Sequence, residues 1–130
     1  MLENFIKVFD QNCDNLVAQL AWETPVRHYS ELVEKLVRLF DDDQYDSPSC
    51  YDIKCNTFGD YTGVQVFLFG NNSCYPTKFW TISVSYGSCS GCDTLQAIND
   101  ATEYDEPVGI EVAKKYVTLM LHMLQSMKEV

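Results

Sequence analysis

The spacing of apolar side chains changes twice along this chain of 130 residues, and that change most constrains its fold. Apolar residues recur at steps of three and four over Leu2–Leu20, Val26–Phe40 and Ala113–Met127, whereas residues 51–86 alternate with a step of two. Steps of three and four place side chains on one stripe of a helix, and a step of two places them on one face of a strand. The sequence therefore predicts an α+β fold whose strands lie in the middle third of the chain.

The order of the segments predicts an αα-βββ-αα arrangement in one domain, residues 1–130. Few residues separate the first two helical segments, so we expect an antiparallel helical pair. The second helix is expected to begin at Thr24-Pro25, a capping residue followed by proline at the first helical position. A hydrophobic content of 46% over this length is enough to form one core.

Residues 51–56, 64–69 and 79–86 are rich in β-branched and aromatic side chains, which predicts a three-stranded antiparallel meander. Gly59–Gly63 and Gly70–Ser73 supply the turns between these strands. Asp93 and Gln96 have the spacing of a capping box for a short helix, and Pro107 is expected in the first turn of the last helix. These two C-terminal helices should pack, like the first pair, on one face of the sheet.

The formal net charge is −10, from 19 acidic and 9 basic residues. Direct binding of nucleic acid or of an anionic membrane requires clustered Lys and Arg, so this charge argues against both. The same charge is typical of a protein that occupies a basic surface on a partner, including a basic nucleic-acid-binding surface. The candidate contacts are two acidic segments, which contain Asp41, Asp42, Asp43, Asp46, Glu103, Asp105 and Glu106.

The sequence predicts a soluble protein of the cytoplasm. The N-terminal residues carry Glu3, Asp10 and Asp14 among apolar side chains, unlike a secretory signal peptide. The longest apolar region, Tyr116–Leu124, is too short to span a bilayer. Cytoplasmic thiols are kept reduced, so the six cysteines are expected to be free.

Cys89-Ser90-Gly91-Cys92 joins the last predicted strand to the short helix and is the most distinctive motif. A CxxC pair before a helix is typical of a reactive dithiol, because the helix N-terminus stabilises a thiolate. Two features oppose this interpretation: the context is not βαβ, and the adjacent Asp93 is expected to raise the thiol pKa. A structural corner is the other interpretation, with Gly87 and Gly91 at positive φ, local hydrogen bonds from Ser88 and Ser90, and compact buried cysteines.

A zinc site is a further hypothesis for Cys89 and Cys92. Zinc needs four ligands, and one CxxC supplies two. The second pair could be Cys50 and Cys55, or Cys74 could act with His28 or His122. A phosphate-binding loop is disfavoured because no Lys or Arg lies between Tyr86 and Glu106.

Three segments resemble a pattern in small uncharacterised bacterial and bacteriophage proteins: GDYTG (Gly59–Gly63), SVSYGSCSGCDTLQAI (Ser83–Ile98) and TLMLHMLQSMK (Thr118–Lys128). This resemblance implies a phage or mobile-element setting, in which small acidic proteins often bind a host or defence protein. It supplies no catalytic residue and no cofactor. We therefore expect a non-enzymatic inhibitor or regulator that docks on such a partner, with an oligomeric state that the sequence leaves open.

Two alternatives remain open at this point. The first is a zinc-binding or thiol-active protein that uses Cys89 and Cys92. The second is a module that holds a small ligand or nucleotide between the sheet and the helices.

Overall fold

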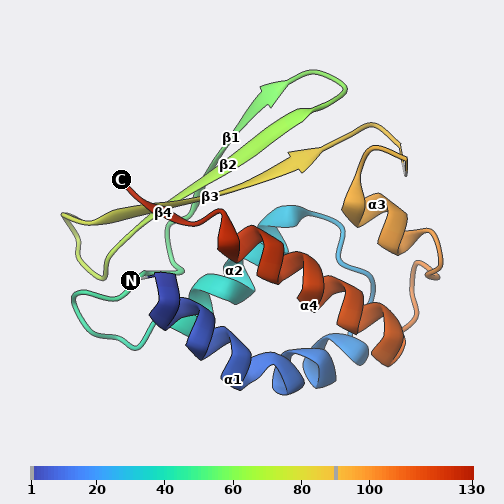
Figure 1. The fold of residues 1–130 in the computed structure, drawn as a ribbon, viewed down its shortest axis with the longest axis horizontal. Helices are drawn as coiled ribbons and strands as arrows, with labels where there is room; N and C mark the ends of the chain where they lie inside the picture. The colour runs from blue at the N-terminus through green and yellow to red at the C-terminus, as the bar shows by residue number, and fades with distance from the viewer. Residues whose placement is uncertain (1, 90) are drawn as a thin grey trace.

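A computed structural model describes residues 2–89 and 91–130, and it has the α+β architecture that the sequence predicts. The elements follow the order α1 (Leu2–Ala21), α2 (Tyr29–Phe40), β1 (Lys54–Gly59), β2 (Gly63–Gly70), β3 (Phe79–Tyr86), α3 (Thr94–Asn99), α4 (Gly109–Gln125) and β4 (Lys128–Glu129). Figure 1 shows the helices on one side of a twisted sheet. Helix α1 runs alongside α4 and contacts it more extensively than it contacts α2.

The sheet has four antiparallel strands in the order β1-β2-β3-β4, so the prediction of three strands was wrong. After α4 the chain turns at Ser126 and Met127, and β4 pairs with Trp80 and Thr81 of β3. The backbone N–H of Val130 donates to the carbonyl of Phe79 at 2.9 Å. A strand of two residues is too short to show an alternating pattern, which explains why the sequence did not indicate it.

Helix α2 begins at Tyr29, four residues after the predicted start at Pro25. Pro25 and Val26 instead lie in a buried segment without regular secondary structure, in which the backbone N–H of Val26 donates to the Tyr116 hydroxyl. The carboxylate of Glu31 accepts from the backbone N–H groups of Arg27 and His28, both at 2.8 Å. Two N–H groups at the helix start are thereby satisfied, so a long-range contact and a local cap together set the start of α2.

The starts of β1 and α4 also differ from the predicted ones. Strand β1 begins at Lys54, so Tyr51 lies before the strand. Helix α4 begins at Gly109, and Pro107 precedes it. The backbone N–H of Val108 donates to the carbonyl of Glu23 at 3.0 Å, which fixes the entry to α4 against the end of α1.

One face of the sheet supplies the core. Phe67 and Phe69 on β2 and Trp80 and Ile82 on β3 are each at most 2% exposed, and they form one buried cluster with the helices. Full burial of one such side chain stabilises the fold by about 1.5–3 kcal/mol. The opposite face is left uncovered by the helices (Figure 1) and carries side chains that the register places together: Lys54, Asn56, Phe58, Val64, Val66, Leu68, Phe79, Thr81, Ser83 and Ser85.

Candidate functional site

The loop from Gly87 to Asp93 joins β3 to α3, and we call it the corner. Asp93 is the N-cap of α3, as its spacing predicts, and its Oδ1 accepts from the backbone N–H of Gln96 at 3.1 Å. The Gln96 side chain does not complete a capping box. Its Nε2 instead donates to the carbonyl of Gly87 at 3.0 Å, which ties the two ends of the corner together.

Asp93 is only 6% exposed, and its carboxylate has two further donors. Oδ1 accepts from the Tyr29 hydroxyl at 2.8 Å, and Oδ2 accepts from the backbone N–H of Gly87 at 2.9 Å. The Tyr29 hydroxyl in turn accepts from the backbone N–H of Leu95 at 3.2 Å. Burial, opposed by the Leu95 hydrogen bond and assisted by the Asp93 carboxylate, raises the pKa of Tyr29 to about 12. A buried carboxylate with three donors is a structural anchor.

Gly87 is required by close approach and not by its backbone angle. The positive-φ glycines of the described residues are Gly59 and Gly109, so the expectation of positive φ at Gly87 was wrong. The φ of Gly91 depends on Ser90, so that expectation stays a prediction. A Cβ atom at Gly87 would lie 2.4 Å from the carbonyl oxygen of Cys92 and 2.6 Å from its Sγ. The corner therefore folds back tightly onto Gly87. Ser90, for which local hydrogen bonds were expected, lies outside the described residues.

The corner brings Cys89 and Cys92 into direct contact, with the two Sγ atoms 3.0 Å apart. The backbone N–H of Cys92 donates to the Cys89 carbonyl at 3.0 Å, so a tight turn holds the pair. Both cysteines are free and exposed, which contradicts the expectation that they are compact buried groups. Two accessible thiols in contact are the most chemically capable arrangement that the corner provides.

The hydrogen bond with the Cys89 thiol is the main reason that the pKa of Cys92 lies below its ordinary value. The pKa of Cys92 therefore shifts in the direction opposite to the one expected from the adjacent Asp93. The Asp93 carboxylate is directed at Tyr29 and Gly87, whose donors compensate its charge. By contrast, burial is the main cause that raises the pKa of Cys13 and of Cys50.

Cys50 and Cys55 lie away from the corner and line a hollow of about 320 Å³ together with Glu31 and Glu34. Cys50 Sγ lies 3.7 Å from Oδ2 of Asp41, and Cys55 is exposed on the edge strand β1. Across the described ranges, no three His, Cys, Asp or Glu side chains come together as a metal site. The other suggested ligands are an exposed Cys74, the N-cap His28 and an exposed His122.

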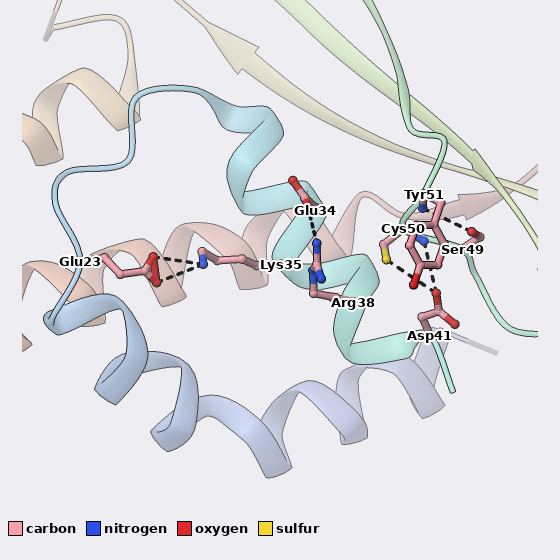
Figure 2. Close-up of polar contacts among 8 residues, drawn as sticks. All are labelled: Glu23, Glu34, Lys35, Arg38, Asp41, Ser49, Cys50 and Tyr51. Atoms are coloured by element: carbon pink, nitrogen blue, oxygen red, sulfur yellow. Dashed lines mark hydrogen bonds and ion pairs between the residues drawn. The ribbon is translucent and has the colours of Figure 1, made fainter. Parts of the chain in front are cut away.

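The first acidic segment, Asp41–Asp46, forms hydrogen bonds and an ion pair with neighbouring residues. Burial acts to raise the pKa of Asp41, but hydrogen bonds from Asn72 and from the backbone N–H groups of Asp43 and Cys50 hold it below its ordinary value. Figure 2 shows Asp41 directed at Cys50. Asp46 forms an ion pair with Lys78 at 3.6 Å. Asp42 and Asp43 remain exposed.

The second acidic segment, Glu103–Glu106, joins α3 to α4, and we call it the acidic connector. Its carboxylates are exposed, and none takes part in an ion pair among the residues that the structure describes. Figure 1 shows this connector at the opposite end of the molecule from the loop that follows α2, so the two acidic segments form separate surfaces.

Sequence reasoning missed two exposed aromatic residues: Tyr104, which lies within the acidic connector, and Trp22, which directly follows α1. Tyr104 is 74% exposed, and the guanidinium of Arg27 lies 3.8 Å from the centre of its ring. Trp22 is 82% exposed and precedes Glu23, whose carbonyl binds Val108 at the entry to α4. The signal available in the sequence was a tryptophan just beyond Leu20, the last residue of the first apolar stripe.

A hollow of about 540 Å³ lies between the end of α1, the following loop and α2. Both cations that line it are paired with carboxylates, as Figure 2 shows: Lys35 with Glu23 at 3.2 Å and Arg38 with Glu34 at 2.5 Å. These pairs leave no cation of the hollow free to bind a phosphate group, so its charges give no support to a nucleotide site. The hollow therefore adds nothing to the small-ligand alternative.

None of the helices in the described part of the chain combines the length and apolar character needed to cross a bilayer. Comparison with known proteins adds no family: no protein-family model, no curated protein and no solved structure matches the chain.

Proposed function

We propose that the protein is a non-enzymatic binding protein that docks on a basic surface of a host or defence protein through its acidic connector. The resemblance to bacterial and bacteriophage proteins supports the setting. The observation that carries the proposal is the combination of unpaired carboxylates and exposed aromatic side chains at one end of the molecule. Glu103, Asp105 and Glu106 provide the charge, and Trp22 and Tyr104 provide apolar contact area.

Charge complementarity supports a basic partner. Of the 19 acidic residues, Asp93 alone is buried among the described residues, and four others belong to ion pairs there. The remaining carboxylates give the surface an uncompensated negative field, which attracts a positively charged partner and raises the association rate.

The exposed aromatic residues Trp22 and Tyr104 supply binding energy in addition to the electrostatic attraction. Exposed Trp and Tyr are enriched among the residues that dominate binding energy at protein interfaces. Arg27 lies over the Tyr104 ring, and its Nη2 is 3.5 Å from the Tyr104 carbonyl. This contact orders the connector before binding and so reduces the entropy lost on association.

The segment that follows α2 is the weaker candidate. Asp41 accepts hydrogen bonds from Asn72 and Cys50, and Asp46 is paired with Lys78. These carboxylates hold the loop in place, so their removal would disturb structure as well as charge. Asp42 and Asp43 stay in the proposal as secondary contacts.

A matched pair of charge variants tests the proposal. The connector variant carries Glu103→Gln, Asp105→Asn and Glu106→Gln, and the control carries Glu3→Gln, Asp10→Asn and Asp14→Asn on the exposed face of α1. Both raise the net charge by the same amount. Tagged protein captures the partner from a bacterial lysate, and the affinity for the purified partner is then measured at low and high salt.

Exposed ion pairs contribute about 0.2–1 kcal/mol each, so three of them predict a loss of affinity of about 3- to 140-fold for the connector variant. Trp22→Ala should also weaken binding, whereas the α1 variant should not. Displacement of the protein from its partner by an oligonucleotide would identify a nucleic-acid-binding surface as the target. An affinity that does not change with salt, or an equal loss for both charge variants, would contradict the proposal.

A further inference from the structure

The corner holds a pair of thiols that the binding role does not use. Cys89 and Cys92 are both exposed, and their Sγ atoms lie 3.0 Å apart. A disulfide bond requires a separation of about 2.0 Å, so the sulfur atoms need to approach by about 1 Å. Rotation of two exposed side chains can supply a movement of this size.

The backbone around the pair is already arranged for closure. The Cys92 N–H to Cys89 carbonyl hydrogen bond brings the two residues into one turn. Gly87 gives Cys92 room, because any side chain at position 87 would collide with the Cys92 carbonyl and Sγ. Asp93 and Gln96 fix both ends of the corner to α3. Closing the bond therefore leaves the anchors in place.

The remaining cysteines lack this arrangement. Cys13 and Cys50 are partly buried, and burial raises the pKa of each thiol. Cys55 and Cys74 are exposed, and neither shares a sulfur contact within the part of the chain that the structure describes. A thiolate is the attacking form in disulfide exchange, and the pKa of Cys92 is lowered by the Cys89 thiol. Cys92 is therefore the better nucleophile of the pair.

We propose that Cys89 and Cys92 form a thiol–disulfide exchange site that accepts a low-molecular-weight disulfide, RSSR. The Cys92 thiolate attacks one sulfur of RSSR, which forms a Cys92–SR mixed disulfide and releases one thiolate RS⁻. The Cys89 thiolate then attacks Cys92 Sγ, which breaks the Cys92–SR bond and releases the second RS⁻. The two RS⁻ groups take up the two protons that the cysteines lose, so RSSR is reduced by two electrons to two RSH while the protein dithiol is oxidised to a disulfide.

Reaction of the full chain with glutathione disulfide tests this site. Intact mass should fall by about 2 Da, the mass of two hydrogen atoms, and peptide mapping should place the bond between Cys89 and Cys92. The variant Cys89→Ser should accumulate a glutathione adduct on Cys92, because the resolving thiol is absent. The variant Cys92→Ser should form its adduct on Cys89 several times more slowly. A control that carries Cys55→Ser and Cys74→Ser should close the disulfide like the parent.

Three results would overturn the proposal. The first is independent glutathione adducts on Cys89 and Cys92 in the parent protein, without closure. The second is a reaction of Cys92 that is no faster than that of Cys74. The third is one equivalent of zinc in protein purified without chelator that prevents oxidation, because this result would assign the pair to a metal. Circular dichroism of each variant shows whether a lost reaction comes from a lost fold.

Discussion

Removal of the Asp93 carboxylate should destabilise the protein strongly. The variant Asp93→Ala deletes the acceptor of three hydrogen bonds, from the Tyr29 hydroxyl and from the backbone N–H groups of Gly87 and Gln96. Gly87 and Tyr29 are buried, so their donors cannot be taken over fully by water. A control variant is Asp100→Ala, which removes an exposed carboxylate from the other end of α3.

The size of the effect follows from those partners. Loss of a helix N-cap costs about 1 kcal/mol, and each buried donor left without an acceptor costs about 1–3 kcal/mol. Partial relaxation of the corner reduces the sum, so we expect the free energy of unfolding to fall by about 2–4 kcal/mol. For a domain whose total stability is about 5–15 kcal/mol, this is a large fraction. Asp100→Ala should change stability by less than about 0.5 kcal/mol.

Urea unfolding followed by tryptophan fluorescence measures both variants. Trp80 is 2% exposed and reports on the core, whereas Trp22 is already exposed and changes little on unfolding. With a urea dependence of about 1–3 kcal/mol per molar, the expected loss lowers the midpoint of Asp93→Ala by roughly 0.7–4 M. The slope should stay unchanged, because the same surface becomes exposed on unfolding.

A double-mutant cycle with Tyr29→Phe tests the reasoning directly. If the Tyr29 hydroxyl stabilises the fold through Asp93, the two substitutions together should cost less than the sum of the separate costs, by about 0.5–3 kcal/mol. Additive costs, or a loss for Asp93→Ala no larger than that for Asp100→Ala, would show that the buried carboxylate is not the anchor of the corner.

Two further predictions concern Tyr29 and Gly59. Burial, with help from Asp93, raises the pKa of Tyr29 in the folded state to about 12, whereas the value in the unfolded state is near 10. The neutral Tyr29 hydroxyl therefore contributes to the free energy of unfolding below pH 10, and this contribution is lost as the pH rises through 12. Urea titrations at pH 9 and pH 12 should therefore show the parent losing about 2–3 kcal/mol more than Tyr29→Phe, and equal losses would contradict this origin. Gly59 has φ +114°, and a Cβ atom there would lie 2.3 Å from the Thr62 carbonyl, so Gly59→Ala should lower the unfolding free energy by at least about 1 kcal/mol. Gly91→Ala, whose nearest Cβ contact is 3.9 Å, is the matched control, and a similar cost for both would refute the strain.

Periodicity predicted the elements better than their ends. The helical and strand periods located α1, α2, α4 and the strands β1, β2 and β3, because each buries a stripe or face against one core. The short helix α3 was located by the capping-box spacing of Asp93 and Gln96. The start of α2 escaped prediction because it depends on Tyr116, which is 90 residues from Val26 in the chain and binds its backbone N–H. Strand β4 escaped because backbone pairing with Trp80 and Thr81, and not side-chain alternation, defines it.

The corner shows the same division between local and long-range causes. The cap at Asp93 could be predicted because Gln96 lies three residues away. Its burial could not, since the Tyr29 hydroxyl that binds it comes from a helix 64 residues earlier. Without that partner, the sequence assigned Asp93 a charge effect on Cys92, whereas the contact with Cys89 determines the direction of the pKa shift.

The same anchors make the two proposals separable. The corner is held at Gly87 by Asp93 and Gln96, so closing the Cys89–Cys92 bond changes the exposed turn and leaves α3 in place. At the far end of α3, Asn99 donates to the Val26 carbonyl and accepts from the Tyr116 hydroxyl, which fixes the helix before the acidic connector begins. We therefore expect disulfide formation in the corner to leave the position of the acidic connector unchanged. Disulfide exchange can fail while partner binding persists, and the loss of connector charge can abolish binding while both thiols still react.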